Sequence, residues 1–226
     1  MFAIKEIFKS FQGEGSKVGH PCIFVRFAGC NLWSGQEHLR DKGRGDCALW
    51  CDTDFFRGDK YTPEQLLMKM NNLTADSKVK MVVFTGGEPT LQLRKTEAVG
   101  LIQKLLNIGW IVAVETNGTL GFQECPVLET IYNHPNGHIT VSPKLLKGSM
   151  EIDHIKLRSG TDLKIICPTN LPIEEFATFN FEYFYLQPME QQDGNPGMSE
   201  LQDTLHLCRK YGWRLSCQTH KLVQMR

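Results

Sequence analysis

Short runs of β-branched and aromatic residues alternate along this chain with longer segments whose apolar residues recur at helical spacing. A run at 3–8 precedes six main runs that predict strands, at 22–28, 79–84, 110–115, 138–142, 162–167 and 181–188. The segment at 213–221 predicts a final strand and tail. Because strands and helical segments alternate, we predict an α/β fold with a parallel sheet.

Six main strands are fewer than the eight that close a (β/α) barrel. We therefore predict a partial, open (β/α)6 barrel with an N-terminal extension, formed by residues 1–226 as a single domain. The clearest helix start follows Thr62, which can act as N-cap, with Pro63 in the first turn and Gln65 completing a capping box. Further helices are expected near 98–106, 127–131, 172–178 and 201–208.

A polar cluster follows each of five predicted strands. These clusters are the loop at 30–54, TGGEP at 85–89, ETNG at 115–118, SPK at 142–144 and QPME at 187–190. In a parallel barrel, the loops after the strands meet at the carboxyl edge, where active sites form. Five clusters at one topological position are hard to explain by stability alone, so we expect them to line one site.

Three cysteines in the first of these loops indicate a metal site. Sixteen residues separate Cys30 from Cys47, and three separate Cys47 from Cys51. Three protein ligands leave one coordination position open, which suits a catalytic zinc ion or a four-iron cluster with one uncapped iron. Disulfides or idle thiols are the alternative, although no secretory context supports disulfides. Trp50 directly precedes Cys51, where an aromatic ring could shield a cluster from water.

The remaining cysteines carry no such pattern. We expect them to be buried or idle thiols: Cys22, Cys125, Cys167, Cys208 and Cys217. Arg26 is a different case, because it places a charge within the apolar run at 22–28 and must find a partner. A structural carboxylate and a substrate carboxylate are equally compatible with the pattern.

Bulk composition narrows the possible partners and location. Lys plus Arg and Asp plus Glu both number 25, so the net charge is zero and does not favour nucleic acid or an anionic membrane surface. No apolar run is long enough to span a bilayer, and the N-terminus has no signal-peptide core. Eight cysteines without a secretion signal indicate a reducing compartment, so we expect a cytoplasmic protein.

Taken together, the motifs resemble those of the radical S-adenosylmethionine superfamily and, within it, the 7-carboxy-7-deazaguanine synthase family. TGGEP and ETNG are typical of the superfamily, whereas QGEG at 12–15, CDTDF at 51–55 and QTHK at 218–221 are specific to the synthase family. The resemblance runs from residue 5 to residue 221. One departure is the cysteine spacing, which is wider than the CxxxCxxC pattern of the superfamily in both gaps.

The resemblance implies a fold of the radical S-adenosylmethionine type, with a [4Fe-4S] cluster on Cys30, Cys47 and Cys51. It also implies a set of residues around S-adenosylmethionine: Gly87, Asn117, Ser142, Pro143, Lys144, Gln187, Pro188, Met189 and Glu190. Gly87 would use its backbone, because a side chain there would block the cofactor.

The family's substrate is 6-carboxy-5,6,7,8-tetrahydropterin, which is converted to 7-carboxy-7-deazaguanine with loss of ammonia in 7-deazapurine and queuosine biosynthesis. The residues that the resemblance places at the substrate are Phe11, Gln12, Gly13, Glu14, Arg26, Thr85 and the C-terminal Arg226. Arg26 would take the carboxylate, and Arg26 and Thr85 are the candidate catalytic contacts. Thr53 would be the sole protein ligand of Mg²⁺, although a loop-capping hydroxyl is the simpler interpretation of Thr53 alone.

Two other functions remain compatible with parts of the sequence. A glycyl-radical activase would share the TGGEP-like loops but would not require QGEG, Arg26 or QTHK. A non-enzymatic, zinc-stabilised binding module would require only the cysteines. For the synthase, the expected partners are the pterin, an electron donor such as flavodoxin and a second copy of the chain, because a partial barrel leaves an edge strand to cover.

Overall fold

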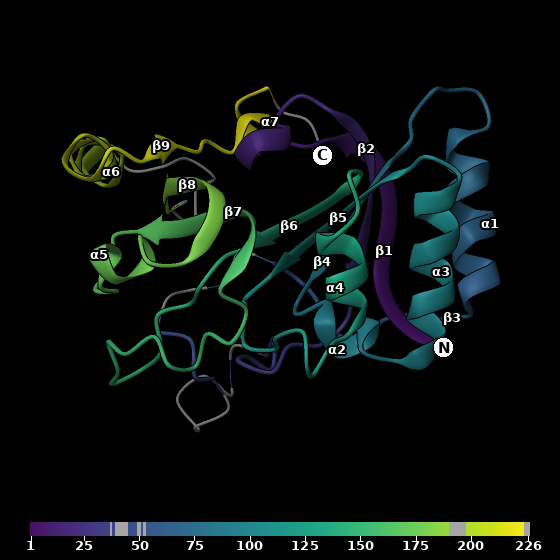
Figure 1. The fold of residues 1–226 in the computed structure, drawn as a ribbon, viewed down its shortest axis with the longest axis horizontal. Helices are drawn as coiled ribbons and strands as arrows, with labels where there is room; N and C mark the ends of the chain where they lie inside the picture. The colour runs from purple at the N-terminus through teal and green to yellow at the C-terminus, as the bar shows by residue number, and fades with distance from the viewer. Residues whose placement is uncertain (37, 39–44, 49–50, 52, 190–197, 224–226) are drawn as a thin grey trace.

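The computed structural model describes residues 1–36, 38, 45–48, 51, 53–189 and 198–223. Trp50, Glu190 and Arg226 therefore lie outside the described residues. The described strands form one sheet in the order β3-β1-β2-β4-β5-β6-β7-β8-β9 (Figure 1). Their bounds are β1 Phe2–Phe11, β2 Pro21–Phe27, β3 Asp59–Tyr61, β4 Met81–Gly86, β5 Ile111–Thr116, β6 Gly137–Val141, β7 Ser159–Cys167, β8 Asn180–Pro188 and β9 Arg214–Leu215.

The six strands from β2 to β8 are parallel to one another, and β1 adds an antiparallel extension with β3 at its outer edge. The sheet runs from β3 to β9 and does not close among the described residues. This arrangement confirms the prediction of a partial (β/α)6 barrel with an N-terminal extension.

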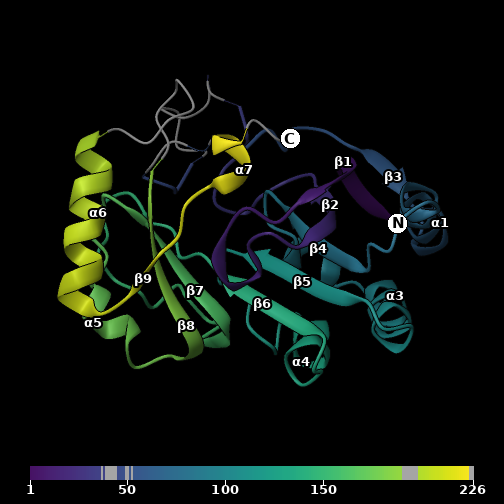
Figure 2. The ribbon, with the colours of Figure 1, turned by 90° about the horizontal axis from the view of Figure 1, so that it is seen from above.

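The longer helices cover the outer, convex side of the curved sheet, as Figure 2 shows for α1, α3, α4 and α6, while α7 lies on the concave side. The helix bounds are η1 Gly15–Lys17 (a 3-10 turn), α1 Pro63–Thr74, α2 Thr90–Leu93, α3 Thr96–Asn107, α4 Val127–Tyr132, α5 Ile173–Phe176, α6 Met198–Tyr211 and α7 Thr219–Leu222. The β3 strand and the short α2 helix were not predicted from the sequence.

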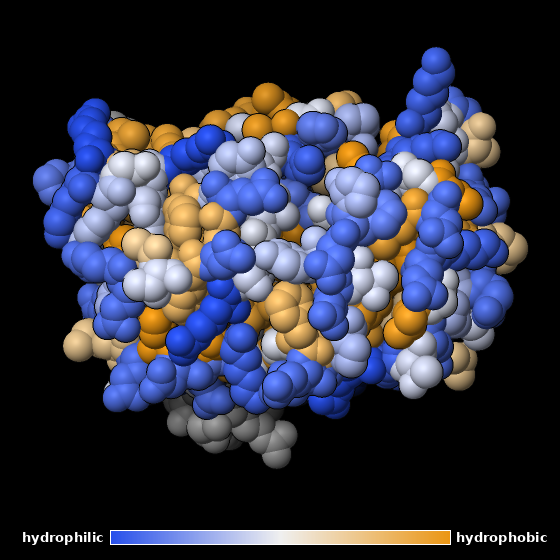
Figure 3. All heavy atoms as spheres, in the orientation of Figure 1, coloured by the Kyte–Doolittle hydropathy of each residue, from blue (hydrophilic) through white to orange (hydrophobic). Residues whose placement is uncertain are grey.

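The core lies between the convex face of the sheet and these helices. Alternate residues of the central strands contribute to it, among them Val82 and Phe84 of β4 and Val112 and Val114 of β5, all fully buried. The apolar face of α3 that the sequence predicts is also buried in this core. On the face of the molecule shown in Figure 3, polar side chains cover most of the surface, with smaller apolar areas between them. In the described chain, no helix is both long enough and apolar enough to cross a bilayer.

The last predicted strand is largely wrong. Only Arg214–Leu215 pair with β8, and Thr219–Leu222 form the short α7 helix instead. The physical reason is that the backbone N–H of Thr219 donates to the carbonyl of Gly13, 3.0 Å away, which turns the chain away from the sheet edge. The helix predicted at 172–178 is confirmed but shorter, at Ile173–Phe176.

The capping box of α1 provides a direct test of the sequence-based assignment. Thr62 Oγ1 accepts from the N–H of Gln65 at 3.2 Å, and Gln65 Oε1 accepts from the N–H of Thr62 at 2.9 Å. We expect Thr62→Ala to lower the free energy of unfolding by about 1 kcal/mol, because the first turn loses a bonded N–H. Urea unfolding followed by circular dichroism measures this change.

Thr96→Ala is the matched control. Thr96 begins α3, is exposed, and its side chain makes no hydrogen bond among the described residues. This variant should change the free energy of unfolding by less than about 0.5 kcal/mol. Equal effects of the two substitutions would contradict a stabilising role for the cap.

Candidate active site

A cavity of about 540 Å³ opens on the concave side, at the carboxyl ends of the parallel strands. All five polar clusters contribute to its wall, as the strand order predicts. The residues expected at the site that line it are Phe11, Gln12, Glu14, Arg26, Cys30, Cys47, Cys51, Thr53, Thr85, Gly87, Asn117, Ser142, Pro143, Lys144, Gln187, Pro188 and Met189. Gly13 is not among the lining residues, and Glu190 and Arg226 lie outside the described residues.

The three cysteines of the 30–54 loop share this cavity and form no disulfide. Cys30 Sγ accepts from the N–H of Leu32 at 3.4 Å, and the Cys51 thiol lies 3.9 Å from the carbonyl of Thr53. Within the described ranges, no three His, Cys, Asp or Glu side chains are grouped closely enough to hold a metal ion. Metal binding deprotonates thiols and contributes energy that orders the ligand loop. The chain therefore places three thiols that form no disulfide around one cavity rather than in a closed cage.

The wide gap before Cys47 is accommodated by contacts with two other segments. The N–H of Asp46 donates to the carbonyl of Leu32 at 2.7 Å, and the N–H of Ala48 donates to the carbonyl of Leu145 at 2.8 Å. Leu145 directly follows the SPK cluster. These bonds fix the approach to Cys47 between the start of its own loop and the loop after β6.

The glycines of TGGEP allow a close approach to the segment that leads into Cys30. Gly86 has φ +127°, and a Cβ on Gly87 would lie 2.1 Å from the carbonyl oxygen of Gly29. The N–H of Glu88 donates to that same carbonyl at 2.9 Å. A side chain at Gly87 would thus collide with protein backbone, which is a structural reason for glycine here whether or not a ligand binds.

Glu88 joins the loop after β4 to the loop after β5. It is fully buried, and its carboxylate accepts from Thr90 Oγ1 at 2.5 Å, Thr116 Oγ1 at 2.7 Å and the N–H of Asn117 at 2.7 Å. Burial raises the pKa of Glu88, and these hydrogen bonds oppose the rise. Asn117 Nδ2 in turn donates to Asn31 Oδ1 at 3.0 Å, so the chain of contacts reaches the residue next to Cys30.

The SPK cluster after β6 is fixed in the same way. The N–H of Ser142 donates to the carbonyl of Thr116 at 2.8 Å, and Lys144 Nζ donates to Ser142 Oγ at 3.1 Å. The hydroxyl and the ammonium group of this cluster therefore lie together on the wall, next to the loop that Glu88 holds.

Arg26 has the structural partner that the sequence left open. Its Nε donates to Glu6 Oε1 at 2.8 Å, from the opposite position on the antiparallel strand β1. The side chain still lines the cavity and is 22% exposed. Among the described residues, the terminal Nη groups of Arg26 make no hydrogen bond, so they remain as donors toward the cavity.

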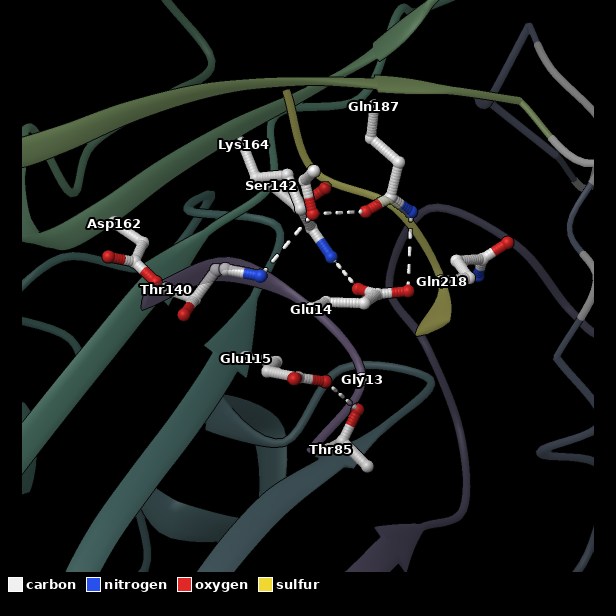
Figure 4. A network of polar contacts seen from close by, with 12 residues as sticks. Gly13, Glu14, Thr85, Glu115, Thr140, Ser142, Asp162, Lys164, Gln187 and Gln218 are labelled. Carbon is white, nitrogen blue, oxygen red and sulfur yellow. Dashed lines mark hydrogen bonds and ion pairs between the residues drawn. The ribbon is translucent and has the colours of Figure 1, made fainter. Parts of the chain in front are cut away.

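Glu115, the first residue of ETNG, was not predicted as a site residue. Its Oε2 accepts from Thr85 Oγ1 at 2.8 Å (Figure 4), and its Oε1 accepts from Gln12 Nε2 at 2.9 Å. Glu115 thus connects two residues that were expected at the substrate. The signal available in the sequence was its position, at the end of a buried strand immediately before the polar turn.

Lys164 on β7 was also missed, although it places a charge within an apolar strand just as Arg26 does. Its Nζ contacts Glu14 Oε2, and Gln187 Nε2 donates to Glu14 Oε1 at 3.2 Å (Figure 4). Burial lowers the pKa of Lys164, with a smaller effect from the positive charge of Lys221. The carboxylate of Glu14 acts in the opposite direction by favouring the charged lysine.

Gly13 packs directly against Thr219 and His220 of the QTHK segment. The carbonyl of Gly13 accepts from Thr219 Oγ1 at 3.1 Å as well as from the N–H of Thr219. A Cβ at Gly13 would lie 1.9 Å from His220 Nδ1. The QGEG loop and the QTHK segment are therefore packed in direct contact, and His220 lines the cavity from this position.

The cysteines outside this loop contribute nothing to the cavity wall. Cys22, Cys125, Cys167 and Cys208 are buried, Cys217 is partly buried, and none of the five is a lining residue. Burial raises the pKa of Cys22 and of Cys125 to about 12, which keeps both as neutral thiols. Their positions agree with the expected packing role.

Comparison with known structures supports the fold. A crystal structure of QueE from Escherichia coli superimposes with a TM-score of 0.67, covering 96% of this chain and 93% of that one, at 24% sequence identity. A likeness at this identity establishes the shared architecture, including the open, mostly parallel sheet.

Sequence comparison establishes the family. The model of the radical SAM superfamily matches residues 33–142. The 7-carboxy-7-deazaguanine synthase of Burkholderia multivorans is 38% identical, over 99% of both chains, and that of Bordetella pertussis is 36% identical, over 98% of both. The corresponding synthase of Caulobacter vibrioides is 37% identical, again over 98% of both chains. The chain therefore belongs to the 7-carboxy-7-deazaguanine synthase family of the radical S-adenosylmethionine superfamily.

Proposed function

We propose that this protein is a carbon–nitrogen lyase that converts 6-carboxy-5,6,7,8-tetrahydropterin to 7-carboxy-7-deazaguanine with loss of ammonia. The observation that carries the proposal is that the family-specific QGEG and QTHK segments meet at the cavity that the three cysteines also line. Family membership alone indicates radical chemistry with S-adenosylmethionine but does not locate the site. The contact between these two segments at the cavity supports a single site for cofactor and substrate.

The residues present suit the cofactors of this family. Cys30, Cys47 and Cys51 would hold a [4Fe-4S] cluster, because all three line one cavity and form no disulfide. When bound, the cluster and S-adenosylmethionine supply a 5′-deoxyadenosyl radical. The chain's own contribution is to orient the two small molecules and to exclude water and other hydrogen donors.

The cofactor wall consists of the loops after β4, β5, β6 and β8. We assign to it Gly87, Asn117, the cluster at 142–144 and the cluster at 187–190. The Glu88 contacts hold the first two loops together, so a cosubstrate against this wall would meet a fixed backbone. Lys144 would present a positive charge to the carboxylate of S-adenosylmethionine.

The substrate wall consists of β1, β2 and the QGEG loop. Arg26 would bind the pterin carboxylate through its Nη donors while Glu6 holds Nε. Thr85 and Gln12 share Glu115, which would orient both toward the ring. Phe11 and Gly13 would contribute backbone contacts, and the carboxylate of Glu14 would accept from the guanidine-like edge of the pterin.

Three further assignments complete the proposal. Thr53, which lines the cavity, would hold a Mg²⁺ ion, which would supply positive charge beside the substrate. The terminal carboxylate of Arg226 would reach the substrate. A flavodoxin-like donor would supply electrons, and a second copy of the chain would cover an exposed sheet edge.

Turnover by the reconstituted protein tests the function directly. Anaerobic protein carrying iron and sulfide should be brown, with broad absorbance near roughly 400 nm. With S-adenosylmethionine, Mg²⁺ and a reductant, it should convert the carboxypterin to 7-carboxy-7-deazaguanine, detected by mass spectrometry. Cleavage of S-adenosylmethionine without this product would favour an activase, and colourless zinc-loaded protein would favour a binding module.

The ligand assignment predicts a sharp division among the cysteines. Cys30→Ser, Cys47→Ser and Cys51→Ser should each abolish cleavage of S-adenosylmethionine and lower the iron content, because a serine hydroxyl is a poor iron ligand. Cys208→Ser is the control, since Cys208 is buried and does not line the cavity. Equal losses in all four variants would rule out the assignment.

Arg26→Ala should raise the KM for the carboxypterin by about tenfold or more, because hydrogen bonds to charged groups contribute roughly 1.5–3 kcal/mol. The KM for S-adenosylmethionine should change little. Arg158→Ala is the control, since Arg158 pairs with Asp153 at 3.6 Å and does not line the cavity. An unchanged carboxypterin KM combined with reduced stability would show that Arg26 serves only as the partner of Glu6.

A further inference from the structure

The QGEG loop bridges the open side of the barrel. It leaves β1 near one end of the sheet, yet its contacts are with β7, β8 and the segment after β9 at the other end. Ser16 Oγ and the N–H of Ser16 both donate to Asp162 Oδ2, at 3.0 and 2.9 Å. The N–H of Gly15 donates to Ser216 Oγ at 3.3 Å. Together with the bonds from Thr219 to the carbonyl of Gly13, these contacts anchor the loop on both sides of Glu14.

Glu14 itself is held by a closed set of side chains. Lys164 contacts one carboxylate oxygen, and Gln187 donates to the other. Ser216 Oγ donates to Gln187 Oε1 at 2.9 Å, and it is the same hydroxyl that accepts from Gly15. Figure 4 shows the Lys164 and Gln187 side chains converging on Glu14 from two neighbouring strands.

The pair is nearly buried, since the side chains of Lys164 and Glu14 are 8% and 14% exposed. A buried ion pair costs desolvation energy that its attraction does not always offset, so it is weak evidence for a role in stability. Removing one partner leaves the other charge buried and unpaired. Without Lys164, Glu14 would take up a proton or turn toward water, and it would no longer present a fixed, ionised carboxylate to the cavity.

We propose that Lys164 is a positioning residue that keeps Glu14 ionised and directed at the guanidine-like edge of the pterin. Lys164 acts through Glu14 and makes no direct contribution to the chemistry. This inference rests on the proposed function, because it presumes a pterin in the cavity. It assigns a role in substrate affinity to a lysine of the sheet interior.

The test is a double-mutant cycle on the full-length reconstituted enzyme, with KM and kcat for the carboxypterin as readouts. Lys164→Met should raise KM by about tenfold or more and change kcat much less, and Glu14→Gln should do the same. If Lys164 acts through Glu14, adding Lys164→Met to Glu14→Gln should raise KM by less than about twofold further. Multiplying effects would overturn the inference, because they would indicate a direct contact or a general loss of structure.

Fluorescence titration with 6-carboxypterin provides a second readout that does not depend on turnover. Lys164→Met should weaken its binding, Lys164→Arg should restore part of it by keeping the charge, and the affinity for S-adenosylmethionine should stay unchanged. Lys156→Met is the matched control, since Lys156 pairs with Glu124 at 2.6 Å on the surface and does not line the cavity. If Lys164→Met fails to fold, the Lys164→Arg and Glu14→Gln variants carry the same comparison.

The outcomes separate this inference from the proposed function. Wild-type enzyme that forms no 7-carboxy-7-deazaguanine would overturn the proposed function and this inference together. Wild-type enzyme that turns over normally, with Lys164→Met equal to it in KM and pterin binding, would overturn the inference alone.

Discussion

The two-residue alternation of a β-strand is the constraint on which both the core and the site depend. Successive side chains of a strand point to opposite faces, so each parallel strand gives one set of residues to the helices and the other to the cavity. In β4, the side chains of Val82 and Phe84 lie in the core, and that of Thr85 lines the cavity. In β7, the side chains of Leu163 and Ile165 lie in the core, and that of Lys164 lines the cavity. A single shift of register would exchange the two sets.

Register between neighbouring strands then assembles a polar band across the concave face. Arg26 is paired in register with Thr85, Glu115 with Thr140, and Thr140 with Asp162. Thr85 and Glu115 are joined by a direct hydrogen bond. Residues far apart in sequence become neighbours because parallel strands align their carboxyl ends. This polar band is therefore a property of the sheet, and the loops after the strands add glycines, cysteines and helix caps to it.

This division explains what the sequence could and could not predict. The six parallel strands, the cap at Thr62 and the five polar clusters are local patterns, and the structure confirms them. Lys164 and Glu115 were missed because their importance comes from partners more than 100 residues and about 30 residues away, respectively. The short β9 strand was misjudged because Thr219 is drawn to Gly13, a contact that no local pattern contains. The cysteine trio lies at one cavity, but its ligand geometry depends on a metal that local patterns do not describe.

The contact between Gly13 and Thr219 also has a consequence for the order in which the protein matures. During synthesis, the first two strands and the parallel sheet can form as the chain emerges. The QGEG loop, however, contacts Thr219, which is synthesised some 200 residues later. Until that segment has left the ribosome, Gly13 has no Thr219 to contact, and this side of the cavity is incomplete. A nascent or C-terminally shortened chain would therefore carry Cys30, Cys47 and Cys51 at a cavity that lacks the part of its wall formed by the QTHK segment.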